Sequence, residues 1–444
     1  MRSIRLCLFQ LLGLALIHAG GEASAADAPQ TFSPQELRQD LAELQAEIER
    51  IHPDVEHSVR KADLARAVAG VKARLDRSMT REEAWFAMAA LNPVMADGHL
   101  VVTFPGGTGA EIQRHLSSGG RLFPFDVHVA ADGELFIRSG FNGEASALQG
   151  RRIDAIDGVP GRELVARFLA LVNGDTPAFQ RALLSARFAF YYWKLFGDKQ
   201  SYRLKVGGVE SVVAGRSEMP LAYADRPFDQ LFRFEMPNAR QAVLTVNQFY
   251  WREKSQFYDF TRDAFARMRA AGTQTLVIDI RGNSGGDDDM WIEGLMPYIA
   301  TKPFRNGSDY VLKIIEGRQK EGQKVGDVVR GSQSTYQPQP DNPLRFTGKV
   351  YVLIGPYTYS SAILFANVVQ DYGFATVVGT GGAARATQSG GTQNVKLRHT
   401  QIGLVVPRFL LKRPSGAEGL VQPDVLIPDD PFRTATAIEA LLRL

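Results

Sequence analysis

The feature that most constrains this fold is an alternation of apolar, strand-like runs with helical stretches, which begins near residue 236. The strand-like runs cover residues 242–246, 275–280, 350–354 and 374–378. Stretches with helical spacing, such as 257–271 and 361–372, separate them. Short runs of this kind are typical of strands buried on both faces, and helices between them connect parallel strands. We therefore expect an α/β layered domain in this part of the chain.

A different pattern precedes this region, because residues 33–92 have helical spacing. Ser33 with Glu36 and Thr80 with Glu83 are capping boxes that predict helix starts. The apolar positions of these helices are spaced three and four residues apart, as in helices that pack against a core. We expect a helical N-terminal segment over residues 26–117.

The stretch from residue 100 to 212 has short β-like runs and several glycine turns. Residues 148–160 combine a Gly turn, an alternating strand and an Asp-Gly turn, and the helical stretch 162–172 follows. This order resembles a PDZ domain of the kind found in bacterial exported proteases, with residues 201–206 as its closing strand. Such a module binds an extended peptide by adding it to a sheet edge. The resemblance implies a PDZ-like, β-rich module over residues 118–212.

The first 25 residues are typical of a cleaved secretory signal. Arg2 and Arg5 precede an apolar stretch, and Ala23-Ser24-Ala25 is a small-residue cleavage pattern. We therefore expect an exported protein, periplasmic or extracellular. Cleavage would remove Cys7, the only cysteine, so the mature chain would have no disulfide and no thiol nucleophile.

Composition excludes several classes of protein. Hydrophobic residues make up 45% and charged residues 22% of the chain, which excludes wholesale disorder. The formal net charge is only +3 and no long basic run occurs, so we expect no nucleic-acid partner. No stretch after the signal is apolar enough to predict stable membrane insertion.

Two serines follow predicted strands. Ser284 lies in Gly282-Asn283-Ser284-Gly285-Gly286, which contains the G-x-S-x-G pattern of a nucleophile elbow. Asp371 and His399 would then complete an esterase-like triad. The alternative interpretation is a glycine turn whose N–H groups face a ligand.

Ser360 lies at the junction between the predicted strand 350–354 and the helical stretch 361–372. Unpaired N–H groups and the helix dipole at such a junction stabilise a developing negative charge. By position alone Ser360 is equally an ordinary N-cap residue.

The glycine turn at 282–286, the junction at Ser360 and the closing segment 416–425 together resemble the C-terminal processing (tail-specific) serine peptidases and the related tricorn core. The resemblance implies that Ser360 is the nucleophile of a serine endopeptidase. It also implies that Gly285, Gly286 and Ser361 supply the oxyanion hole, which leaves Ser284 as a turn residue.

Arg385 departs from one branch of this family, which keeps a catalytic lysine at that position. A guanidinium stays protonated and cannot serve as a general base. The other branch pairs its serine with a histidine and a glutamate. Asp97-Gly98-His99 resembles the D-G-H motif of that branch, and Glu418 lies where that branch keeps its acid. The resemblance therefore implies His99 as base and Glu418 as its orienting carboxylate.

The sequence predicts no metal site and no cofactor. The remaining histidines show no ligand spacing, and the carboxylates of Asp287, Asp288 and Asp289 are more simply explained as a charged first helical turn.

The overall prediction is an α/β multidomain protein: signal 1–25, helical segment 26–117, PDZ-like module 118–212 and α/β, crotonase-like peptidase core 213–444. Its partner would be a polypeptide substrate. The alternatives are an exported esterase that uses Ser284 and an inactive peptide-binding scaffold.

Overall fold

The computed structural model describes residues 30–443, and its centre is a six-stranded sheet. The predicted signal peptide and Cys7 lie outside the described residues. All neighbouring strands of the sheet are parallel except the antiparallel first pair. In spatial order the strands are β10 (Phe232–Asn238), β11 (Gln241–Val246), β12 (Thr275–Asp279), β15 (Lys349–Ile354), β16 (Thr376–Gly379) and β21 (Val425–Leu426).

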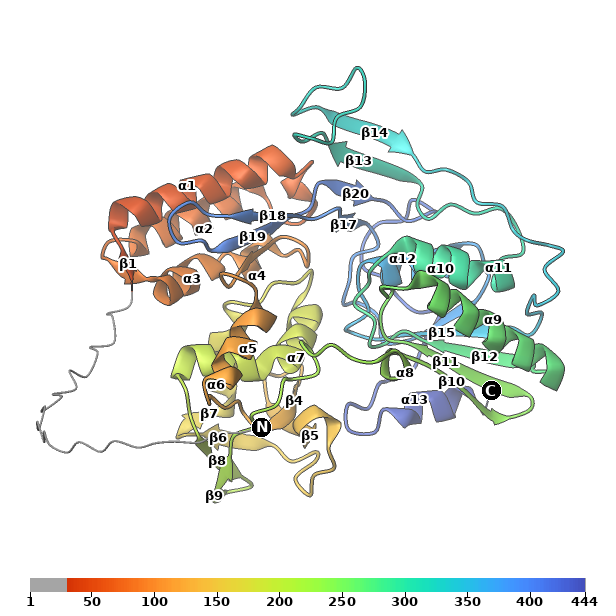
Figure 1. Cartoon of the computed structure of the whole chain (residues 1–444), viewed down its shortest axis with the longest axis horizontal. Helices are drawn as coiled ribbons and strands as arrows, with labels where there is room; N and C mark the ends of the chain where they lie inside the picture. The colour runs from red at the N-terminus through yellow and green to blue at the C-terminus, as the bar shows by residue number, and fades with distance from the viewer. Residues whose placement is uncertain (1–29, 444) are drawn as a thin grey trace, which may run out of the picture.

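Helices cover both faces of this sheet, which explains why its strands are continuously apolar (Figure 1). One face carries α9 (Lys254–Ala271), α10 (Asp288–Gly294), α11 (Met296–Ile299) and α12 (Ser361–Asp371). The other face packs Val243, Val277 and Leu353 against α13 (Ala435–Leu441). The predicted α/β core is confirmed.

The N-terminal segment is helical, as predicted, and both capping boxes form. Ser33 and Glu36 cap α1, and Thr80 and Glu83 cap α3. The helices are α1 (Pro34–Ile51), η1 (Val55–His57), α2 (Lys61–Arg74), α3 (Arg81–Ala89), α4 (Asn92–Met95) and α5 (Thr108–Ser117). A two-stranded sheet of β1 (Thr31–Phe32) and β2 (Met79–Thr80) accompanies them.

This segment is joined to the C-terminal part of the chain by a shared sheet. Strand β3 (Val101–Thr103) pairs with β19 (Gly403–Val406), which also pairs with β18 (Gln393–Lys396). The buried Asp40 of α1 accepts hydrogen bonds from the backbone and hydroxyl of Thr400, at 2.8 and 2.6 Å. The N-terminal segment therefore packs directly on residues of the predicted core.

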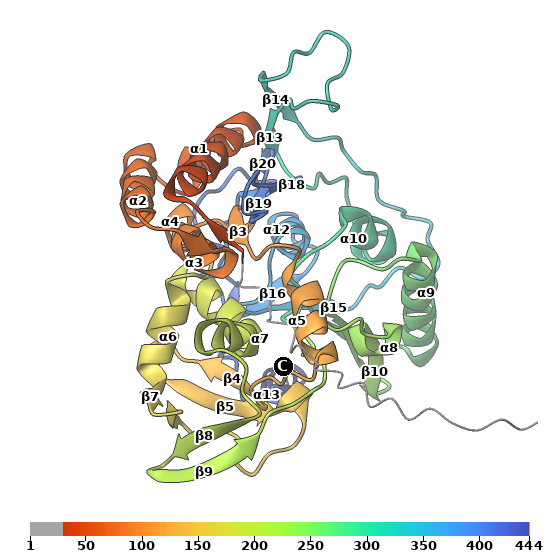
Figure 2. The same ribbon diagram turned by 60° about the vertical axis from the view of Figure 1, so that its left-hand side comes forward.

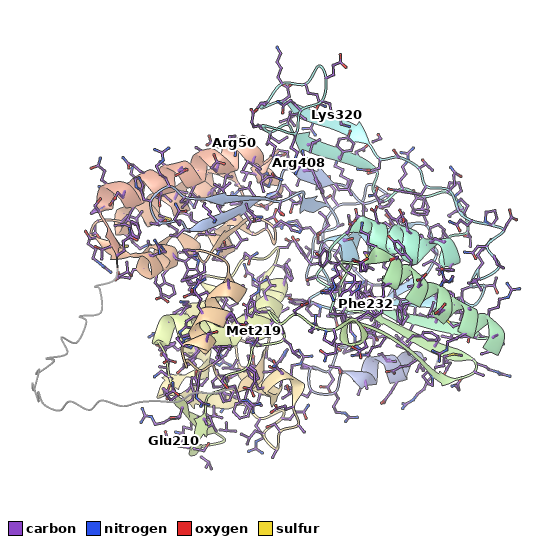
Figure 3. All side chains as sticks on the ribbon, in the orientation of Figure 1. Arg50, Glu210, Met219, Phe232, Lys320 and Arg408 are labelled. Atoms are coloured by element: carbon purple, nitrogen blue, oxygen red, sulfur yellow. The ribbon has the colours of Figure 1, made fainter. Side chains whose placement is uncertain are left out.

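Residues 301–346 contain a protruding hairpin. Strands β13 (Asp309–Lys313) and β14 (Val328–Ser332) form it, and Lys320 lies near its tip (Figure 3). The hairpin extends a four-stranded sheet through β20 (Phe409–Leu411) to β17 (Gln388–Gly390). This sheet thus connects a surface feature to the region around Ser360.

The middle module has two small sheets covered by two helices (Figure 2). Its strands are β4 (Phe125–Val129), β5 (Leu135–Gly140), β6 (Ile153–Ile156), β7 (Val159–Pro160), β8 (Ser201–Val206) and β9 (Val209–Ala214); its helices are η2 (Phe141–Gly143), α6 (Gly161–Leu169) and α7 (Pro177–Phe196). Helix α7 was not predicted, because it is apolar around most of its circumference and lacks a clear stripe. A linker then leads through α8 (Phe228–Leu231) into the core.

Within residues 30–443, no helix is both long and apolar enough to cross a membrane.

Candidate active site

Ser360 occupies a tight, strained junction between β15 and α12. Its φ of 54° and ψ of −127° are rare for a residue with a side chain, and its hydroxyl does not cap the helix. Thr358 fixes the preceding turn, because its hydroxyl donates to Ile280 O and accepts from Gly355 N. Ser360 therefore stands at the N-cap position of α12 without capping the helix, which leaves its hydroxyl free for another partner.

The loop that carries Asp97-Gly98-His99 joins α4 to β3 and brings His99 to Ser360. The distance from His99 Nε2 to Ser360 Oγ is 3.1 Å, although the residues are far apart in sequence. Burial lowers the pKa of His99, and the carboxylates of Asp97 and Asp175 partly oppose this shift. A neutral imidazole beside a serine hydroxyl can accept its proton.

The other nitrogen of His99 contacts a residue that the sequence did not single out. Nδ1 of His99 lies 3.1 Å from Ser389 Oγ, and this hydroxyl donates to Asp97 Oδ1 at 2.8 Å. Because the single hydroxyl proton of Ser389 is used for Asp97, the contact with His99 requires a proton on Nδ1. That tautomer leaves Nε2 free to accept the Ser360 proton. The hydrogen bonds thus form a chain Ser360–His99–Ser389–Asp97.

Asp97 is the buried carboxylate at the end of this chain. Burial would raise the pKa of Asp97, but the neighbouring His99 and His52 hold it below the ordinary value. Its Oδ1 also accepts the backbone N–H of His99 at 2.7 Å, which fixes the loop. In the described part of the chain, neither Asp97 Oδ2 nor the buried Nε2 of His52 has a hydrogen-bond partner.

Glu418 does not join this group, so the expected contact between Glu418 and His99 is a wrong prediction. Its side chain is 78% exposed, and its carboxylate lies 3.5 Å from Lys412 Nζ. The loop 416–419 extends into solvent. The buried Asp97, and not Glu418, is the carboxylate at the end of the hydrogen-bond chain through the imidazole. No sequence motif marks Ser389, because a serine in a three-residue strand has no distinctive context.

Two of the three predicted oxyanion donors are available. Gly285 N–H is already bonded to Asn283 Oδ1 at 2.8 Å, which corrects its predicted role. Among the described residues, no acceptor lies within hydrogen-bonding distance of the N–H groups of Gly286 and Ser361. Both groups remain candidates to bind a developing oxyanion.

Gly285 nevertheless has a steric role. A Cβ at Gly285 would lie 2.5 Å from the Cβ of Ser360, and its φ of 108° also favours glycine. Because this position is a glycine, the turn that follows β12 can approach Ser360 closely.

Arg385 contacts residues next to the D-G-H loop and makes no hydrogen bond with Ser360 itself. Its guanidinium donates to Ala96 O at 2.6 Å and lies 3.5 Å from the buried Asp175. Asp175 also accepts from the Tyr359 hydroxyl at 2.6 Å and from Gly98 N at 3.0 Å. The network ties the D-G-H loop to the residue that precedes Ser360.

The alternative triad is not assembled. Ser284 is exposed, Asp371 forms an ion pair with Arg413, and His399 Nε2 lies 2.8 Å from Gln39 Oε1 on α1. The structure therefore gives Ser284 neither of its proposed partners.

The acidic run 287–289 opens α10, as the simpler interpretation predicted. Asp287 caps the helix and, like Asp289, pairs with Lys254. Within residues 30–443, no group of histidine, cysteine and carboxylate side chains could hold a metal ion.

A serine in a strained strand-to-helix turn, a histidine in contact with it and two open N–H groups are the groups that a serine hydrolase site requires. The model of Peptidase family S41 matches residues 240–427, which span the α/β sheet and include Ser360 and Ser389. This match confirms the resemblance noted in the sequence, and the protein is a serine peptidase.

Two solved structures of CPAF are similar in fold to this chain. Mature CPAF in complex with lactacystin has a TM-score of 0.66 at 15% identity, covering 92% of this chain and 97% of that chain. Mature CPAF alone gives 0.65 at 15% identity, covering 92% and 95%. The photosystem II D1 C-terminal processing protease is more loosely similar, with a TM-score of 0.46 at 16% identity, covering 92% and 96%. No curated protein significantly matches the sequence.

Proposed function

We propose that this serine peptidase is an exported endopeptidase in which Ser360 is the nucleophile and His99 the general base. The observation that carries the proposal is the 3.1 Å contact between Ser360 Oγ and His99 Nε2. A serine hydroxyl is a weak nucleophile near neutral pH, so it needs a base within hydrogen-bonding reach.

In the proposed reaction, Ser360 Oγ attacks the peptide carbonyl carbon while its proton passes to His99 Nε2. The carbonyl oxygen becomes an oxyanion, which the N–H groups of Gly286 and Ser361 stabilise. The imidazolium then gives its proton to the leaving amine as the carbon–nitrogen bond breaks. Water attacks the acyl-enzyme by the same route in reverse and releases the new carboxyl terminus.

Asp97 and Ser389 orient the base in this mechanism. Ser389 holds the proton on His99 Nδ1, and Asp97 stabilises the positive charge that develops on the imidazole. This assignment replaces Glu418, which the sequence resemblance implied.

The substrate is a polypeptide that binds in an extended form. We assign a crotonase-like fold to the core 213–444 and a PDZ-like fold to residues 118–212, which would present a sheet edge to the peptide. Strand β9 is one such edge: it lies at the end of the four-stranded sheet β7-β6-β8-β9, and Val209 and Val212 are 70% and 68% exposed. Glu210 of this strand is labelled in Figure 3.

The test uses a fluorophosphonate label and a peptide digest. Ser360→Ala should abolish labelling, and Ser360→Ala and His99→Ala should each reduce turnover by several powers of ten. The double variant should be little worse than either single variant, because the two groups act as a unit. Ser284→Ala is the matched control and should keep labelling and turnover. Labelling lost with Ser284→Ala and kept with Ser360→Ala would identify the esterase alternative instead.

Export is a separate part of the proposal. Mass spectrometry of the protein from the extracytoplasmic fraction should give an N-terminus near Ala26 and no thiol. A retained Met1 or Cys7 would contradict it.

A further inference from the structure

Asp288 is a half-buried carboxylate at the start of α10 that lies outside the catalytic hydrogen-bond chain. Its neighbours Asp287 and Asp289 pair with Lys254. Asp288 instead accepts a hydrogen bond from the Ser361 hydroxyl through its Oδ1 atom, at 2.6 Å. This length is typical of a hydroxyl that donates to an ionised carboxylate. Asp288 therefore holds the side chain of the residue that follows the nucleophile.

The Ser361 hydroxyl is held from a second side as well. It accepts a hydrogen bond from Nε1 of the fully buried Trp291 at 3.0 Å, and Ser361 itself is buried. Oδ2 of Asp288 accepts from Asn306 Nδ2 at 3.4 Å, which holds the carboxylate in turn. Burial raises the pKa of Asp288, and its hydrogen bond with Ser361 partly opposes this shift. Rotation of the Ser361 side chain would break two hydrogen bonds away from water, so these bonds fix the first turn of α12.

Asp288 links the two segments that supply the open N–H groups. Gly286 lies two residues before Asp288, and Ser361 is the residue whose hydroxyl Asp288 binds. Helices α10 and α12, which begin at these points, lie side by side on one face of the sheet (Figures 1 and 2). The glycine turn is also held from its other side, because Phe249 N–H donates to Gly285 O at 2.9 Å. The bond between Asp288 and Ser361 thus fixes one segment relative to the other.

We propose that Asp288 is a positioning residue that sets the spacing of the two oxyanion donors, Gly286 N–H and Ser361 N–H, through its hydrogen bond with the Ser361 hydroxyl. The inference rests on the proposed function and deepens it, since it names what aligns the oxyanion hole. Both donors must lie about 3 Å from the oxyanion to stabilise it. A change in their spacing therefore weakens binding of the transition state and leaves binding of the substrate nearly unchanged.

The experiment measures kcat and KM of the intact protein on one peptide substrate, and the affinity for a trifluoromethyl ketone analogue of that peptide. Ser360 Oγ adds to the ketone carbon, its proton passes to His99, and the ketone oxygen becomes an oxyanion that stays bound. We expect Asp288→Ala to lower kcat by roughly ten- to a hundredfold, to change KM by less than about threefold and to weaken the ketone by a factor similar to that for kcat.

Asp288→Asn is the conservative variant. An amide oxygen still accepts the hydrogen bond from Ser361, and Asn306 can turn its own amide toward the new NH₂ group, because the buried Asn306 Oδ1 has no partner in the described part of the chain. This variant should restore most of the kcat that Asp288→Ala loses. If Asp288→Asn lost as much as Asp288→Ala, the charge and not the hydrogen bond would be required, which contradicts the proposal.

Ser361→Ala removes the same hydrogen bond from its other end and keeps the backbone N–H. It is the smallest truncation available, so it tests the proposal even if Asp288→Ala does not fold. It should show the same losses, and the double variant should be little worse than either single variant. Asp289→Ala is the matched control, because Asp289 is the next carboxylate on α10 but is exposed and pairs with Lys254. It should keep kcat and ketone affinity within about twofold of wild type.

Wild-type kcat in either Asp288→Ala or Ser361→Ala would overturn the proposal. A fall in kcat with unchanged affinity for the ketone would overturn it as well, since the loss would then not arise at the oxyanion. Failure of the proposed function looks different: the wild type cleaves no peptide, and Ser360 takes no fluorophosphonate label.

Discussion

His99 Nδ1 lies 3.1 Å from the hydroxyl of Ser389, rather than beside a carboxylate. This hydroxyl in turn donates a hydrogen bond to the buried Asp97, at 2.8 Å. A neutral group thus orients the proposed base, and the negative charge is one residue further from the imidazole than in a Ser-His-Asp triad. A charge at greater distance stabilises the imidazolium less but still fixes the tautomer.

Ser389→Ala should therefore lower kcat by roughly ten- to a hundredfold with little change in KM, because the base loses its orientation and not its presence. Steady-state kinetics on one peptide substrate measures this. Ser284→Ala, an exposed serine in the glycine turn, is the control and should stay within about twofold of wild type. If Ser389→Ala lowered kcat no more than the control does, Ser389 would have no role in the mechanism.

The pH profile of kcat/KM tests how burial and Asp97 act on the pKa of His99. Burial lowers the pKa of His99, so its neutral, active form should persist below pH 6.5, and the acid limb should lie below that value. Asp97 opposes this shift by favouring the imidazolium. Asp97→Asn should therefore move the acid limb to still lower pH and reduce kcat. A limb that stayed at the wild-type pH, or moved to higher pH, would show that Asp97 does not stabilise the imidazolium of His99.

Glu418→Gln should have almost no effect on turnover, within about twofold, because the carboxylate is exposed and pairs with Lys412. Lys412→Gln, which removes the other member of the pair, should behave in the same way. A hundredfold loss in Glu418→Gln alone would mean that the loop 416–419 closes over His99 during catalysis.

The sequence predicted those parts of the fold that depend on local pattern. The capping boxes at Ser33 and Thr80 and the buried strands of the core are encoded within a few residues each, so the local pattern was enough. The D-G-H motif and the junction at Ser360 were also recognisable, and the structure brings them into contact.

Interactions between distant segments could not be predicted. Ser389 acts through the position of a three-residue strand, and that position depends on its pairing with β20. The hydrogen bond from Gly285 N–H to the Asn283 side chain is likewise a detail of one turn that the sequence pattern does not reveal, although the glycine itself was identified from the sequence. Helix α7 was missed because its tyrosines, phenylalanines and tryptophan contact neighbours on several sides and leave no polar face.

His52 should make stability depend on pH. Burial lowers the pKa of His52 to about 4 from the ordinary 6.5. Its contribution is fully present above pH 6.5 and is lost as the pH falls toward 4, because only the unfolded chain binds a proton there. The slope is at most about 1.4 kcal/mol per pH unit. Urea denaturation between pH 7 and 5 should show a shallower pH dependence for His52→Gln. Parallel curves for the two proteins would contradict the assignment.

Gly285→Ala should abolish most activity without unfolding the protein. The new Cβ would lie 2.5 Å from Ser360 Cβ, a separation that real Cβ atoms do not adopt, and the φ of 108° adds strain. Because the nucleophile must move, and a displacement of about 1 Å costs on the order of a hundredfold, we expect kcat to fall at least that far. Gly272→Ala is the matched control: its φ of 68° is also positive, but nothing lies within 4 Å of the added Cβ. It should lower the midpoint of thermal unfolding by a few degrees and leave kcat unchanged. If Gly285→Ala instead kept wild-type kcat, Ser360 would not be held by this turn, and the geometry proposed for its attack would be wrong.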